Sequence, residues 1–142
     1  MFTGEYRHTV DEKGRIAVPA RFRTRLAEGS FLANWIDGCL AIFPRADWEE
    51  LDARIAGLPF TDPAARQLQR FLYGGTIEVD LDRQGRFVIP TNLREYSGLS
   101  GDAVIVGSRD HAEIWAPEQW ASVRRGLSDP DALATLLSGL GI

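Results

Sequence analysis

A pattern of thirteen residues, Asp-x-x-Gly-Arg-x-x-x-Pro-x-x-x-Arg, occurs twice in this chain. The first copy is DEKGRIAVPARFR, from Asp11 to Arg23, and the second is DRQGRFVIPTNLR, from Asp82 to Arg94. Two copies about 70 residues apart are too few and too widely spaced for a solenoid. The pattern therefore predicts an internal duplication in which two similar halves pack against each other.

The residues around each copy predict a β-hairpin. Segments 5–10 and 77–81 alternate apolar and polar residues, which is typical of a half-buried strand. Asp-x-x-Gly then matches a type I turn, in which the Asp side chain accepts hydrogen bonds from the turn backbone. We expect Gly14 and Gly85 to adopt positive φ and close the hairpin.

Each return strand is followed by a proline, which favours the opening of a helix at Pro19 and Pro90. A second hairpin, two helices and matched apolar spacing then follow in both copies, with Asp37-Gly38 as the tip of one hairpin. The Asp-Pro pairs at 62–63 and 129–130 predict the starts of the last helices. Each copy therefore reads as hairpin, helix, hairpin and two helices.

Neither half is large enough to bury its own core, so we expect the two to share one. The prediction is a mixed α+β fold, mainly β: a pseudo-twofold β-barrel made from two tandem repeats, with peripheral helices. The predicted boundaries are a first repeat at 5–50, a helical linker at 51–76, a second repeat at 77–122 and a C-terminal helical tail at 123–142.

Composition sets limits on where the chain works and what it binds. The single cysteine, Cys39, lies in an apolar run, which predicts a buried side chain and a reducing cytoplasm. No membrane span, secretory signal, cofactor motif or metal-ligand cluster is found. The formal net charge is −4, but residues 5–25 carry six basic against three acidic residues, whereas residues 76–96 carry three against four. This distribution favours an anion-binding face weighted to the first copy.

Three interpretations of the motif compete. In the structural one, Asp and Gly form a turn and Pro starts a helix, which explains every residue except the arginine after the glycine. In the enzymatic one, Asp11 and Asp82 form a carboxylate dyad that shares a proton. That chemistry needs two adjacent carboxylates, and each Asp instead belongs to its own turn, so we do not favour an enzyme.

The third interpretation is DNA binding, because a two-stranded ribbon fits the major groove. Arg15 and Arg86 lie just after the turns, where a forked guanidinium reaches base edges or phosphates. Further basic residues of the first copy are predicted to contact phosphates: Lys13, Arg21, Arg23, Arg25 and Arg7.

The two motifs, together with GCLAIFPRADWEEL and HAEIWAPEQW, resemble the duplicated domain of the MraZ family of bacterial transcriptional regulators. The resemblance runs from Met1 to about Arg125 and places the fold in the AbrB-like, swapped-hairpin superfamily. It implies a cytoplasmic, nucleoid-associated repressor of its own operon, the cell-division and cell-wall gene cluster. It also implies binding to repeated boxes in double-stranded promoter DNA, and a ring-shaped homo-oligomer. The family positions implicated in DNA contact correspond here to Asp11 and Arg15, and to Asp82 and Arg86.

The C-terminal segment SDPDALATLLSGLGI departs from the resemblance, because its four leucines form an apolar helical stripe. The stripe either packs into the core of its own chain or contacts a neighbouring subunit. The alternative function is a protein-interaction module of the antitoxin type. Such modules carry one hairpin copy and an acidic tail, so two copies and an apolar tail favour the regulator.

Overall fold

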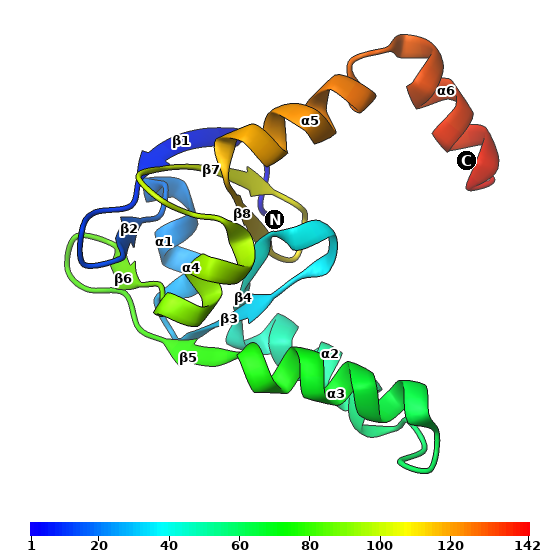
Figure 1. Cartoon of the computed structure of the whole chain (residues 1–142), viewed down its shortest axis with the longest axis horizontal. Helices are drawn as coiled ribbons and strands as arrows, with labels where there is room; N and C mark the ends of the chain where they lie inside the picture. Colours follow the sequence, from blue (N-terminus) through cyan, green and yellow to red (C-terminus); the bar gives the residue numbers. More distant parts are fainter.

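The order of helices and strands repeats once along the computed structural model, which describes all residues from 1 to 142 (Figure 1). The first half contains β1 (Glu5–Thr9), β2 (Arg15–Ala17), α1 (Ala20–Leu26), β3 (Ser30–Asn34), β4 (Leu40–Pro44), α2 (Arg45–Ala56) and α3 (Pro63–Gly75). The second half contains β5 (Ile77–Val79), β6 (Arg86–Val88), α4 (Thr91–Ser97), β7 (Asp102–Gly107), β8 (Ala112–Trp115), α5 (Pro117–Leu127) and α6 (Pro130–Gly139). The predicted order of strands and helices is confirmed in both halves, but the first two strands of each half do not pair as predicted.

Local sequence signals explain where several elements begin and end. Asp62 caps α3 by accepting a hydrogen bond from the Ala64 amide at 2.9 Å, and Asp129 caps α6 in the same way. Asp37 and Gly38 both have positive φ, at 66° and 82°, as the tight turn between β3 and β4 requires. The prolines before α1 and α4 occupy the cap position, one residue earlier than predicted.

Strand pairing links the two halves. The six-stranded antiparallel sheet has the order β1-β7-β8-β4-β3-β5, so β1 pairs with β7 of the second half and β5 pairs with β3 of the first. The remaining strands, β2 and β6, pair only with each other in a separate antiparallel ribbon. Each half therefore places strands against the other.

This pairing corrects two sequence predictions. β1 and β2 do not form a hairpin ladder, because they separate beyond the turn and take partners in the second half. The large sheet is also not a closed barrel. Its edges are β1 and β5, because β2 and β6 pair with each other instead of joining the sheet to close it.

One core serves both halves. Its main cluster contains 19 buried residues drawn from both repeats, among them Ile16 of β2, Leu32 of β3, Phe87 of β6 and Ile105 of β7. Fully burying such a side chain contributes about 1.5–3 kcal/mol relative to leaving it exposed. The core therefore ties the β2–β6 ribbon to the large sheet. Cys39 is buried, as predicted, and burial raises the pKa of its thiol.

The helices that end the two halves are arranged differently. In the first half α2 and α3 lie side by side, and Trp48, Ile55 and Leu72 are buried (Figure 1). In the second half α5 is anchored by buried Trp120, whereas α6 buries no residue and lies at the end of a projecting arm. The leucine stripe is thus not part of the core of its own chain. None of the helices combines the length and apolar composition needed to cross a bilayer.

Candidate nucleic-acid interface

The β2–β6 ribbon brings the two motif arginines onto one face. Arg15 lies opposite Val88, and Ala17 lies opposite Arg86. Because side chains alternate along a strand, these residues share the face reached by solvent, with the arginine side chains 36% and 34% exposed. The other face carries the buried residues Ile16 and Phe87. Arg15 and Arg86 therefore occupy diagonal positions on the outer face of the ribbon, whose inner face packs into the core.

Asp11 holds the first turn and its arginine together. One carboxylate oxygen, Oδ1, accepts hydrogen bonds from the amides of Lys13 and Arg15, both at 2.9 Å. The other oxygen, Oδ2, accepts a hydrogen bond from Nε of Arg15 at 2.7 Å. The turn is closed by the Gly14 amide, which donates to the Asp11 carbonyl at 2.9 Å, with Gly14 at a φ of 79°.

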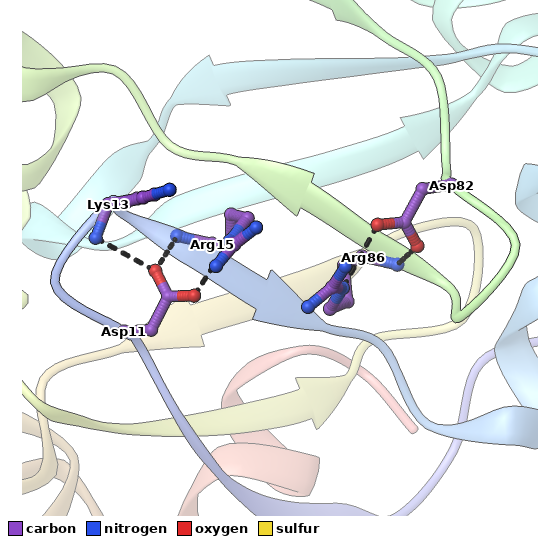
Figure 2. Close-up of polar contacts among 5 residues, drawn as sticks. All are labelled: Asp11, Lys13, Arg15, Asp82 and Arg86. Atoms are coloured by element: carbon purple, nitrogen blue, oxygen red, sulfur yellow. Dashed lines mark hydrogen bonds and ion pairs between the residues drawn. The ribbon is translucent and has the colours of Figure 1, made fainter.

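The second turn repeats this geometry. Asp82 accepts hydrogen bonds from the amides of Gln84 and Arg86 and from Nε of Arg86, all at 2.9 Å. Gly85 has a φ of 72°. Figure 2 shows the two Asp–Arg pairs side by side on the ribbon, each formed within its own turn. The turns and the positive φ values predicted for both glycines are confirmed.

The positions and hydrogen bonds of the two carboxylates do not fit a proton-sharing dyad. Hydrogen bonding to the backbone amide of Arg15, and then to its guanidinium, lowers the pKa of Asp11. The Arg86 amide is likewise the main cause that lowers the pKa of Asp82. A dyad requires adjacent carboxylates and a raised pKa on one of them, but these two lie at opposite ends of the ribbon (Figure 2). Both carboxylates are therefore ionised and engaged with their own turns.

The outer nitrogens of Arg15 and Arg86 remain available. In each residue only Nε and the backbone take part in hydrogen bonds within the chain, so Nη1 and Nη2 have no partner there. The aspartate thus orients each guanidinium and leaves its other edge open. Such an edge donates two parallel hydrogen bonds to a phosphate or to the O6 and N7 atoms of guanine.

The last arginine of each motif crosses to the turn of the other motif. A methyl group on Gly14 would lie 2.9 Å from Cζ of Arg94, and one on Gly85 would lie 2.7 Å from Cδ of Arg23. Arg23 also donates from Nε to the Val18 carbonyl at 3.3 Å. Gly14 and Gly85 are therefore needed for two reasons: each adopts a positive φ, and each leaves room for an arginine from the other half. Sequence reasoning missed Arg94, although its position matches that of Arg23 in the first motif.

The other predicted basic residues are dispersed. Lys13 is exposed in the first turn. Arg21 is exposed on α1 and donates to the hydroxyl of Tyr6 at 3.1 Å, while Arg25 forms a 3.1 Å ion pair with Asp47. Arg7 is exposed on β1, an edge strand of the large sheet. Of these residues, only Lys13 accompanies Arg15 on a turn.

Residues 5–25 are more basic than residues 76–96, but this difference in charge does not extend to the two turns. Each turn gathers three basic residues once the crossing arginine is included. The first turn has Lys13, Arg15 and Arg94 against Asp11 and Glu12, and the second has Arg83, Arg86 and Arg23 against Asp82. Both turns therefore present positive charge, and the second has one acid fewer.

Comparison with known proteins identifies the family. A family model described as "MraZ protein, putative antitoxin-like" matches residues 1–71 and again residues 72–133. The chain belongs to the MraZ family. The two consecutive matches agree with the repeated order of elements, and the resemblance seen in the sequence is confirmed.

Proteins named "Transcriptional regulator MraZ" are similar over almost the whole chain. The protein from Roseiflexus castenholzii is 50% identical over 138 residues, which cover 97% of this chain and 94% of the relative. The protein from Herpetosiphon aurantiacus is 48% identical and that from Desulfitobacterium hafniense 46% identical, both over the full length of each chain.

Proposed function

We propose that this protein is a transcription regulator that binds double-stranded promoter DNA through the β2–β6 ribbon. The observation that carries the proposal is the pair of arginines on one face, each oriented by its own aspartate and each with its outer nitrogens free. The names of the relatives, which are called transcriptional regulators, support the same function.

In the proposed mechanism, two arginines contact the DNA bases and two aspartates orient those arginines. A two-stranded ribbon fits the major groove, where the Arg15 and Arg86 guanidinium groups donate to base edges. Asp11 and Asp82 restrict the arginine rotamers before binding, which lowers the entropy lost on complex formation. Lys13 lies in the turn at one end of the ribbon, where it contacts a phosphate and adds salt-dependent affinity.

The finer parts of the proposal come from the resemblance to the family. The chain acts as a repressor of its own operon, in the cell-division and cell-wall gene cluster, and works in the cytoplasm at the nucleoid. It binds repeated boxes as a ring-shaped homo-oligomer and needs no catalytic activity. Several ribbons on one assembly make the second contact intramolecular, which raises overall affinity by about 10²–10⁴. The exchange of strands between the halves supports an assignment to the swapped-hairpin superfamily.

The test is a gel-shift titration with DNA from upstream of the protein's own gene. A good bidentate contact contributes about 1–3 kcal/mol, so Arg15→Ala is expected to weaken binding about 5- to 150-fold. Arg86→Ala should have a comparable effect, because its turn has the same geometry. Arg125→Ala is the matched control, since Arg125 is exposed on α5, away from the ribbon. Wild-type affinity in both ribbon variants would overturn the proposal.

A protein-interaction module is the second candidate, because the family description includes the word antitoxin-like. The same titration separates the two functions. An interaction module that does not read DNA would bind the upstream fragment no better than random DNA of the same length.

A further inference from the structure

The outer face of the β2–β6 ribbon carries an exposed valine beside the two arginines. Each strand of the ribbon has three residues, and the middle ones, Ile16 and Phe87, are buried in the core. The outer face therefore consists of four side chains: Arg15, Ala17, Arg86 and Val88. Val88 is 50% exposed, and it is the only large hydrophobic residue of any strand that is exposed.

Strand pairing places Val88 directly opposite Arg15. The Cβ atoms of directly opposite residues in an antiparallel pair lie about 4.5–5.5 Å apart, so the valine methyl groups lie beside the arginine side chain. A polar or acidic residue at position 88 would accept hydrogen bonds from the free guanidinium nitrogens, whereas valine offers them no acceptor. This part of the ribbon thus combines an oriented hydrogen-bond donor with an apolar surface next to it.

The major groove of DNA offers a matching pair of features. Guanine presents the O6 and N7 acceptors, and thymine is the one standard base that presents a methyl group. Successive bases of one strand are about 3.4 Å apart, so side chains at the spacing of Arg15 and Val88 reach bases that lie within two base pairs of each other. We propose that Val88 contacts the methyl group of a thymine within two base pairs of the guanine that Arg15 contacts. This inference rests on the proposed function and adds to it a residue that determines sequence preference.

The two arginines of the ribbon differ in their apolar neighbours. Ala17 lies opposite Arg86, as Val88 lies opposite Arg15. The alanine is half-buried, and its side chain ends at Cβ, one bond short of the valine methyl groups. Only the pair of Arg15 and Val88 therefore reaches a thymine methyl group, and the two arginines read different base steps.

The experiment compares two versions of the DNA fragment from upstream of the protein's own gene. One is ordinary DNA, and the other contains deoxyuridine in place of every thymidine, which removes the methyl groups and leaves base pairing unchanged. Gel-shift titrations measure the affinity of wild type and Val88→Ala for both fragments and for ordinary random DNA of the same length. Val88→Ala removes the two methyl groups and leaves the Arg15 nitrogens free.

Leu127→Ala is the matched control, because it also shortens an exposed apolar side chain. Leu127 is 53% exposed at the end of α5, away from the ribbon (Figure 1). Circular dichroism checks that each variant is folded. Wild type and Leu127→Ala should bind the thymine fragment about three- to fivefold more tightly than the uracil fragment, the change that corresponds to one buried methyl group. Val88→Ala should bind both fragments with nearly equal affinity and still prefer upstream DNA to random DNA through its arginines.

Two results would overturn this inference alone. A wild type that prefers upstream DNA but binds the thymine and uracil fragments equally would show that no methyl group is read. A Val88→Ala variant that still distinguishes the two fragments would show that another residue, or the shape of the DNA, senses the methyl groups. A wild type that does not prefer upstream DNA to random DNA would overturn the proposed function and this inference together.

Single uracil replacements along the fragment locate the contact. The replacement that weakens wild-type binding should lie within two base pairs of a guanine whose N7 methylation weakens binding of wild type but has little effect on Arg15→Ala. A methyl-sensitive thymine further away from that guanine would contradict the assignment to Val88, which lies directly opposite Arg15.

Discussion

Replacing Gly14 with alanine isolates the energy of the close approach between the two halves at the first turn. Gly14 has a φ of 79°, and a methyl group there would lie 2.9 Å from Cζ of Arg94 and 2.9 Å from the backbone oxygen of Ile89. Gly101 has the same φ of 79°, but no atom lies within 4 Å of its added methyl group. Gly101→Ala is therefore a matched control that shares the backbone strain and lacks the steric contact.

The expected magnitudes follow from these contacts. The left-handed conformation costs an alanine about 1–2 kcal/mol, and the reduced entropy of the unfolded chain offsets about 0.4–1 kcal/mol of that in both variants. Gly14→Ala also forces a backbone oxygen to move, and overpacking of this kind costs about 1–3 kcal/mol. We therefore expect Gly14→Ala to be less stable than Gly101→Ala by about 1–3 kcal/mol. Gly85→Ala should fall between them, because the three atoms nearest to its added methyl group all belong to the flexible Arg23 side chain.

The assay is urea unfolding at a fixed protein concentration, since assembly makes apparent stability depend on concentration. Two double variants test the contacts further. Adding Arg23→Ala should restore part of the unfolding free energy lost in Gly85→Ala, whereas adding Arg94→Ala should leave most of the loss in Gly14→Ala unchanged. Equal unfolding free energies for Gly14→Ala and Gly101→Ala would refute the reasoning, because the close contact would then have no energetic effect.

Three further predictions concern pH and helix capping. Burial lowers the pKa of His111, but the nearby carboxylates of Glu113 and Asp110 more than offset this and raise it above 6.5. The stabilisation that protonated His111 contributes to folding is thus complete below pH 6.5 and is lost as pH rises through the folded-state pKa. In urea unfolding, the difference in unfolding free energy between wild type and His111→Phe should therefore shrink from pH 6 to pH 8. The pKa values of Asp11 and Asp82 are lowered, so both turns should persist above pH 3.8 and loosen only as pH falls through the folded-state pKa values. The amide NMR shifts of Lys13 and Gln84 would report this change. A change of those shifts already at pH 5 would contradict the prediction. Asp62→Ala removes the cap of α3 and should lower the unfolding free energy by about 1 kcal/mol. An unchanged urea midpoint would show that the cap does not contribute to stability.

The sequence predicted the features that depend on neighbouring residues. The Asp-x-x-Gly turns and the Asp-Pro helix starts are each specified within a few residues. The family resemblance also followed from the two motifs and their flanking segments. These signals are local, because a turn or a cap is satisfied by its own backbone and side chains.

The sequence did not predict which strands pair. The alternation in β1 shows that one face is buried, but it carries no information on whether β2 or β7 covers the adjacent edge. For the same reason the sequence did not show that Arg23, which is predicted to contact phosphate, lies against Gly85, 62 residues further along the chain. The leucine stripe of α6 was recognised, but only the fold shows that its own core leaves it uncovered.

The measurement that most directly tests DNA reading by the β2–β6 ribbon is the affinity ratio between upstream DNA and random DNA of equal length. Wild type is compared with the double variant Arg15→Lys and Arg86→Lys, which keeps both charges but loses the two forked guanidinium groups. The account predicts that affinity for random DNA stays close to wild type while the preference for upstream DNA falls by about tenfold or more. A double variant that keeps the full preference would contradict the account, because the arginines would then supply charge and no reading of sequence.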